Sequence, residues 1–177
     1  MLVLGCMRSA SSSMTEFLLK MTGLPRHYVP LLPGKVKGYE GYPSSTIDYI
    51  SKEMLTEWVC SKDYIIQEHL APIPEHREIL LSIPREQRKI IITKRNWEDS
   101  FRSQMNRDQP TPDPEGCKKS FKIFREDLEV YFPEEDGFLH VEFKDLIGNQ
   151  DREIKKILDY WGIPYDVDKV YKLPHVR

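Results

Sequence analysis

The run Lys-Ile-Ile-Ile-Thr at positions 89–93 constrains the fold of this chain more than any other segment. Four β-branched residues, Ile90 to Thr93, follow one another without alternating with polar residues. A strand that is apolar on both sides must be covered on both faces, as in parallel sheets whose crossover helices lie above and below. The run therefore predicts a central strand of a parallel sheet.

Other segments alternate between short apolar runs and helical patterns. Leu2–Leu4, Tyr64–Gln67 and Phe138–Phe143 read as further strands, and Pro74–Ser82 reads as a short helix. Apolar residues at helical spacing mark four more helices, through Met14, Phe17, Leu18 and Met21; Ile47, Ile50, Met54 and Trp58; Phe121, Phe124, Leu128 and Tyr131; and Ile154, Ile157, Leu158 and Trp161. Strands that alternate with helices indicate βαβ units.

Several residues indicate where helices begin and end. Ser45 and Asp48 have the spacing of a capping box for the second helix, and Asn96 with Asp99 has it for the helix after the central strand. Gly162 and Pro164 should end the last helix. Two stretches read as surface loops: residues 23–45, with four prolines, and residues 107–116, with three.

Charge and cysteine content exclude several classes of protein. The 26 Lys and Arg are balanced by 28 Asp and Glu, so no basic field for nucleic acid is expected. Cys6, Cys60 and Cys117 are odd in number and far apart, which argues against a disulfide framework or a zinc site. Cys117 is expected in a polar loop. The start of the chain lacks the pattern of a signal peptide and no segment is long and apolar enough for a membrane span, so we expect a cytoplasmic protein without a membrane partner.

The segment from Gly5 to Ser12 lies where a phosphate-binding loop belongs, between a parallel strand and its helix. Against the triphosphatase template, Gly5 and Ser12 match, while Ala10 replaces the second glycine and Ser11 the lysine. Amides at a helix N-terminus and the hydroxyls of Ser9, Ser11 and Ser12 still favour an anion, and Arg8 would add a full charge. A cation in the middle of the loop suits a donor that needs no metal ion.

We therefore expect an α/β fold in the form of one three-layer P-loop-type domain over residues 1–177. Its central parallel sheet should have about four to five strands flanked by helices. A second anion contact is expected at the same edge of the sheet, because Arg95 follows the central strand and Ser103 lies two turns into the next helix.

Together, the segments Arg8 to Ser12 and Arg95 to Ser103 resemble the two donor-binding motifs of sulfotransferases that use 3'-phosphoadenosine 5'-phosphosulfate (PAPS). The resemblance extends to residues 31–41 around Glu40 and to residues 138–148 and 161–164. It implies that Arg8, Ser9, Ala10, Ser11 and Ser12 hold the 5'-phosphosulfate, while Arg95 and Ser103 bind the 3'-phosphate. Ser13 stands where many members place an aromatic residue against adenine, and Gln67 stands where the family has a lysine.

Sulfuryl transfer also needs a base for the proton of the acceptor. His69 lies just after a predicted strand at the same edge of the sheet, and Glu68-His69-Leu70 resembles the catalytic histidine segment of cytosolic members. Glu68 and Glu40 are the alternatives, since other branches of the family use a glutamate. Arg8 would stabilise the leaving phosphate.

The sequence thus predicts a sulfotransferase that uses PAPS and no metal, with a small-molecule or carbohydrate acceptor and an undetermined oligomeric state. Two alternatives remain open. The chain could be a non-catalytic nucleotide-binding module of the same fold, as Ala10 and Gln67 suggest. It could also be a P-loop nucleotide or metabolite kinase, which would need magnesium.

Overall fold

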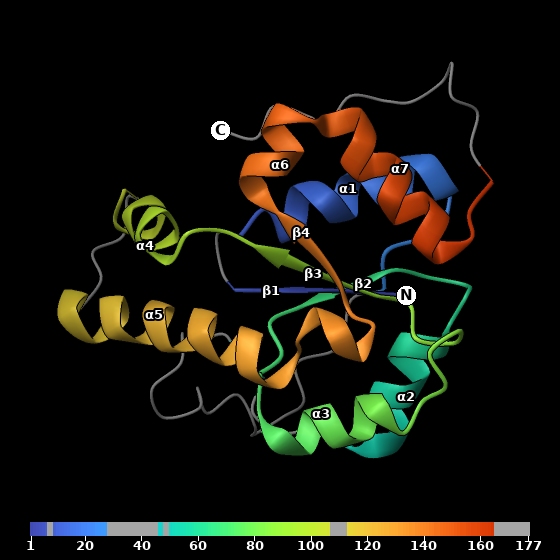
Figure 1. Ribbon diagram of the computed structural model, residues 1–177, viewed down its shortest axis with the longest axis horizontal. Helices are drawn as coiled ribbons and strands as arrows, with labels where there is room; N and C mark the ends of the chain where they lie inside the picture. The colour runs from blue at the N-terminus through green and yellow to red at the C-terminus, as the bar shows by residue number, and fades with distance from the viewer. Residues whose placement is uncertain (7–8, 28–45, 48–49, 107–112, 165–177) are drawn as a thin grey trace.

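A computed structural model describes residues 1–6, 9–27, 46–47, 50–106 and 113–164 of the chain. These residues contain a parallel sheet of four strands in the order β2-β1-β3-β4 (Figure 1). The strands are β1 (Leu2–Gly5), β2 (Ile66–Glu68), β3 (Ile90–Lys94) and β4 (Leu139–Glu142). The predicted α/β class with a parallel sheet of four to five strands is confirmed.

The order of the strands places β1 and β3 inside the sheet. Leu4 of β1 pairs with Glu68 on one side and with Ile92 on the other. All residues of β3 are buried, as the β-branched run predicted, although the strand is shifted one residue beyond residues 89–93. Both inner strands are thus hydrogen-bonded on their two sides and covered on both faces.

Helices cover the two faces of this sheet. They are α1 (Ser11–Thr22), α2 (Lys52–Cys60), α3 (Pro74–Leu81), α4 (Trp97–Met105), α5 (Pro114–Tyr131), α6 (Phe143–Gly148) and α7 (Gln150–Trp161), with a short 3-10 helix at Glu134–Asp136. On one face Leu4 and Ile92 pack with residues of α2, α3 and α5. On the other face Val3 and Ile91 pack with residues of α1, α6 and α7. The result is the predicted three-layer arrangement, and none of the described helices is long and apolar enough to cross a membrane.

The outer side of β2 is partly covered by two isolated bridges, Arg26 with Ile65 and Ile47 with Leu70. The second bridge corrects the predicted start of α2. Ile47 donates its amide to the His69 carbonyl at 2.7 Å, so it is extended instead of helical. The helix begins at Lys52, and Ser51 caps it by accepting from the Met54 amide. The predicted start of this helix was therefore wrong, and the two residues of the predicted capping box, Ser45 and Asp48, lie outside the described residues.

The other helix ends follow local rules. Asn96 accepts from the amides of Glu98 and Asp99, and Gly162 adopts the left-handed conformation that ends α7, as predicted. The loop expected over residues 107–116 ends earlier, because α5 begins at Pro114. Proline suits the first turn of a helix, where its missing amide would have no partner. Cys117 is consequently a half-buried helical residue and not part of a polar loop.

The connections leave the inner strands in opposite directions. From β1 the chain continues to β2 at one edge of the sheet, and from β3 it continues to β4 at the other edge. In open α/β sheets, ligands bind outside the carboxyl ends of the strands at such a reversal of strand order. The topology therefore directs attention to the residues that follow β1 and β3.

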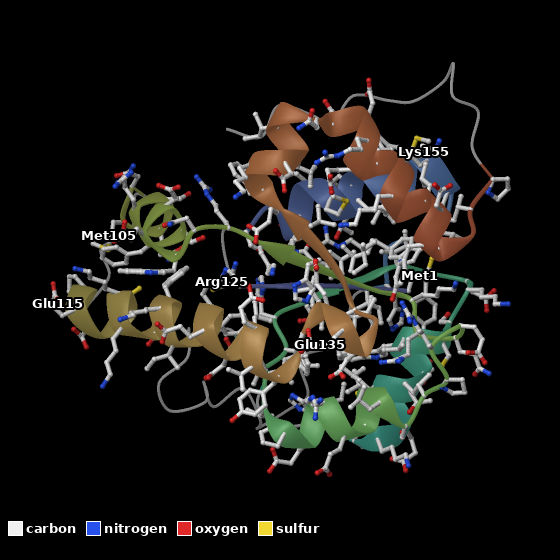
Figure 2. The ribbon with its side chains drawn as sticks, viewed as in Figure 1. Met1, Met105, Glu115, Arg125, Glu135 and Lys155 are labelled. Atoms are coloured by element: carbon white, nitrogen blue, oxygen red, sulfur yellow. The ribbon has the colours of Figure 1, made fainter. Side chains whose placement is uncertain are left out.

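An ionic cluster fixes the carboxyl end of β3 against β4 and α5. Lys94 is buried, and its ammonium lies 2.7 Å from Glu129 of α5 and 3.6 Å from Glu142 of β4. Arg125 bonds to the same two carboxylates, and Figure 2 shows it on α5, toward the sheet. Partial burial opposes ionisation of Glu129, but the bonds from Lys94 and Arg125 lower its pKa to about 2.

We predict that Glu129→Gln lowers the melting temperature at pH 7 by roughly 2–4 °C, as expected for loss of about 1 kcal/mol from a half-exposed carboxylate. Because the pKa of Glu129 in the folded protein lies below the usual value of 4.5, the stabilisation is present above pH 4.5 and is lost as the pH falls toward 2. Thermal melts of the variant and the wild type should therefore converge in acid. Glu126→Gln, which removes an exposed carboxylate of the same helix, is the control. An equal difference at pH 7 and pH 2 would contradict the role of Glu129.

Candidate functional site

The predicted site residues lie along one edge of the sheet, in the order of the strands. His69 follows β2, the loop residues follow Gly5 of β1, and Arg95 follows β3. Neighbouring strands are about 4.8 Å apart, so these positions span on the order of 10 Å. Arg8 and Glu40 lie outside the described residues.

Gly5 is where the chain leaves the sheet, and it must be a glycine. A side-chain Cβ there would lie 2.3 Å from Thr93 Oγ1 and 2.4 Å from Ser9 Oγ. The space is occupied because Thr93 Oγ1 donates to the Leu4 carbonyl at 3.1 Å and lies 2.8 Å from Ser9 Oγ. The single proton of Thr93 goes to the carbonyl, so Ser9 is the donor in the second bond.

Ser9 therefore supports the loop instead of offering its hydroxyl to a ligand. Its side chain is buried and donates to Thr93, and its amide bonds to the Cys6 carbonyl at 3.2 Å. Ala10 follows with φ 73°, in the left-handed region that glycine favours. The alanine thus occupies the second glycine position of the template and adopts the backbone conformation that a glycine would take. This conformation leads directly into α1 at Ser11.

Ser11 and Ser12 are held differently from Ser9. Both hydroxyls accept from the side-chain amide of Gln67, with Nε2 at 3.1 Å from Ser11 Oγ and 3.0 Å from Ser12 Oγ. Gln67 Oε1 in turn accepts from Arg26 Nη2 at 2.6 Å. Ser13 is half-buried in the first turn of α1. The first amides of this helix have no partner within the helix and favour an anion.

His69 is joined to the loop by a short hydrogen bond from Nδ1 to the Gly5 carbonyl, at 2.6 Å. A carbonyl can only accept, so Nδ1 carries the proton and, in the neutral ring, Nε2 has the free lone pair. Burial lowers the pKa of His69 from its usual 6.5, and the bond to Gly5 opposes this only in part. The neutral form, which can act as a base, is therefore favoured at neutral pH.

Glu68 is the second candidate base and precedes His69 in β2. Burial raises the pKa of its carboxyl, while a bond from the His69 amide and the charge of Arg26 lower it. Since side chains alternate along a strand, Glu68 and Gln67 point to opposite faces of the sheet. Gln67 contacts the start of α1, so Glu68 is directed to the other face.

Arg95 begins the second predicted anion contact. Its guanidinium carbon lies 4.3 Å from the centre of the Phe143 ring, at the start of α6. Arg95 and Phe143 line a cavity of ≈ 440 Å³ together with Trp97, Arg125 and Lys144. Ser103 lies half-buried near the end of α4. The cavity therefore presents basic and aromatic side chains, together with the carboxylates of Asp99 and Glu142, at the carboxyl edge of the sheet.

A larger cavity of ≈ 910 Å³ lies at the opposite edge. It is lined by residues that precede the strands or follow α7, among them Met1, Lys89 and Trp161. Figure 2 labels Met1 and Arg125 at opposite ends of the strands. By size alone, the larger cavity would be the better candidate for a binding site. The polar residues near the reversal of strand order, however, lie at the carboxyl edge, beside the smaller cavity. In the described part of the chain, no group of three or more His, Cys, Asp and Glu could hold a metal ion.

Sequence reasoning missed Arg26 and the cluster around Lys94. Arg26 lies in a proline-containing loop and reaches the site only because its segment bridges to Ile65 beside β2. No periodicity or spacing in the sequence indicates this pairing. Lys94 stood outside the predicted strand, although a lysine directly after a buried run already suggests a nearby carboxylate.

The site and the fold together define an α/β domain with a candidate phosphate loop between its first strand and first helix. No family model and no curated protein matches the sequence. Among solved structures, the chain is similar to an unliganded sugar kinase from Janibacter sp. HTCC2649. The TM-score is 0.56 at 16% identity, over 94% of this chain and 95% of that chain. This likeness supports the fold class.

We predict that Gly5→Ala destabilises the protein by about 1–3 kcal/mol, because the new methyl group overlaps Thr93 and Ser9 at the start of the loop. Gly148→Ala is the matched control, since a Cβ at that position meets nothing within 4 Å. Urea unfolding of both variants measures the difference. If both substitutions cost the same, the close packing of Gly5 is wrong.

Proposed function

We propose that this chain is a group-transfer enzyme that binds a phosphate-bearing donor at the carboxyl ends of β1 and β3. More specifically, we propose a sulfotransferase that moves a sulfuryl group from PAPS to a hydroxyl or amine of a small-molecule or carbohydrate acceptor. The proposal rests chiefly on the bond between His69 Nδ1 and the Gly5 carbonyl, which holds a neutral imidazole beside the phosphate loop.

In the proposed reaction, the acceptor oxygen or nitrogen attacks the sulfur of PAPS. The bond from sulfur to the 5'-phosphate oxygen breaks, and 3'-phosphoadenosine 5'-phosphate (PAP) leaves. The acceptor proton passes to His69 Nε2, because Nδ1 is already protonated and bonded to Gly5. Ser11, Ser12 and the first amides of α1 donate to the leaving phosphate.

The rest of the donor would extend toward β3. Arg95 lies two residues after Thr93, whose hydroxyl is bonded to Ser9 of the loop, so the arginine follows β3 close to where this strand contacts the loop. Arg95 and Ser103 are the proposed ligands of the 3'-phosphate. Arg8 is proposed as the cation of the loop from the sequence alone.

A P-loop kinase is the second candidate, and the fold similarity to a sugar kinase favours it. It would transfer a phosphoryl group from ATP with magnesium. Ser11 stands at the lysine position of the triphosphatase template, and the inner strand β3 presents Thr93, not a carboxylate, to the loop. These residues favour the sulfuryl donor over the triphosphate.

We predict that calorimetry detects binding of PAP with a dissociation constant in the micromolar range, about −8 kcal/mol. Arg95→Ala should weaken this binding at least about tenfold, because a hydrogen bond to a charged group is worth about 1.5–3 kcal/mol. Arg152→Ala, which removes a largely exposed arginine of α7, is the control. Binding of ATP with magnesium and no response to PAP would reject the sulfotransferase in favour of the kinase.

We predict that His69→Asn lowers kcat roughly 100-fold or more while the affinity for PAP stays unchanged, because the substitution removes the base but not the donor contacts. The base must be neutral to work. Since the pKa of His69 is lowered, the wild type should lose activity only below pH 6.5, on the acid side of an ordinary histidine. Release of PAP from PAPS with a panel of phenols, measured from pH 5 to 8, tests both points. An unchanged rate in the variant would shift the role of base to Glu68 or Glu40.

A further inference from the structure

A chain of hydrogen bonds leads from Arg26 to the start of α1. Arg26 Nη2 donates to Gln67 Oε1 at 2.6 Å. Gln67 Nε2 then donates one proton to Ser11 Oγ at 3.1 Å and the other to Ser12 Oγ at 3.0 Å. These bonds connect the segment that follows α1, strand β2 and the first turn of α1.

The direction of each bond in this chain is fixed by chemistry. A guanidinium has only donors, so the atom of Gln67 that faces Arg26 must be the carbonyl oxygen. The amide nitrogen must therefore face the serines, and its two protons are used by the two hydroxyls. Each hydroxyl accepts from Gln67 and retains its own proton for donation.

Ser9 shows the contrast within the same loop. Its hydroxyl donates to Thr93 and is buried, so its proton points into the protein. Ser11 and Ser12 are oriented differently, because each accepts from Gln67 and keeps its own proton for a further partner. Ser12 is exposed, whereas Ser11, the first residue of α1, is buried beside it.

We infer that Arg26 and Gln67 are positioning residues for the phosphate loop, and that they orient the hydroxyls of Ser11 and Ser12 toward a bound anion. Hydrogen bonds in a chain polarise one another, so the cation at one end strengthens the donors at the other. Arg26 thereby contributes positive charge to the site without touching the ligand. Glu16 Oε1 lies 3.3 Å from Nη1 of the same guanidinium, so this half-exposed carboxylate holds Arg26 in place and offsets part of its charge.

This inference rests on the proposed function only in that the loop binds a phosphate group. It accounts for a cation near α1 although Ser11 stands where the triphosphatase template has a lysine. Gln67, polarised by Arg26, would make the two hydroxyls stronger hydrogen-bond donors and would hold each of them in one orientation.

The test is calorimetric titration of the full chain with PAP, with inorganic pyrophosphate and with ATP plus magnesium. Gln67→Met and Arg26→Gln should each weaken binding about tenfold, because both remove the orientation of charge-assisted donors. Arg26→Lys should restore part of the affinity, since lysine can still donate to Gln67. Gln87→Met, at the opposite edge of the sheet, and Arg152→Gln are the matched controls.

A double-mutant cycle separates positioning from a general structural effect. In a Ser11→Ala, Ser12→Ala background, Gln67→Met should cost no further affinity, because the groups that it orients are gone. Additive losses would mean that Gln67 acts by another route and would overturn the inference. Melting temperatures of all variants, measured by circular dichroism, identify any variant that is weakened by unfolding.

The outcomes for the inference and for the proposed function differ. If PAP binds and the Gln67 and Arg26 variants bind it as tightly as the wild type, the positioning role is wrong and the sulfotransferase proposal stands. If pyrophosphate or ATP binds and PAP does not, the sulfotransferase proposal is wrong and the same variants test the positioning role on that ligand. If none of the three anions binds, both are overturned.

Discussion

Thr93 holds the loop after β1 against β3 through a hydroxyl that donates to Leu4 and accepts from Ser9. Because this contact fills the space above Gly5, the chain must leave β1 without a side chain there. The left-handed turn at Ala10 follows, and α1 then begins with its amides at the carboxyl edge of the sheet. The positions of Ser11, Ser12 and the first amides of α1 therefore depend on the contact between the two inner strands.

Positive charge at this edge is organised in two ways. Lys94 is buried and is neutralised by Glu129 and Glu142, so it holds β3, β4 and α5 together and leaves little field for a ligand. Arg95 instead lies over Phe143 at the wall of a cavity. Lys94 and Arg95 are adjacent at the end of β3 but have different roles. Lys94 is structural because it is paired with the carboxylates of α5 and β4.

Much of the fold could be predicted because its determinants are local. The β-branched run gave β3, and Asn96 gave the start of α4, since a strand propensity and a helix cap act within a few residues. The start of α2 could not be predicted, because Ile47 has helical spacing but forms backbone hydrogen bonds with His69 and Ala71, beyond the end of β2. His69 and Arg95 could be predicted as site residues, because each lies just after a predicted strand. Arg26 could not be predicted, because Gln67 is 41 residues away and the contact depends on the bridge between Arg26 and Ile65.

The difference between local and long-range contacts also explains how the loop departs from the triphosphatase template. Ala10 keeps the backbone conformation of the glycine it replaces, at a cost on the order of 1 kcal/mol for a left-handed residue with a Cβ. Ser11 does not replace the chemistry of the lysine by itself, because a hydroxyl carries no charge. With Gln67 and Arg26 behind it, however, Ser11 belongs to a chain that ends in a guanidinium. In the proposed arrangement, Arg26 acts on the loop through Gln67, whereas the lysine of the template would act directly. Only the position of β2 beside α1 brings Gln67 and the two serines together.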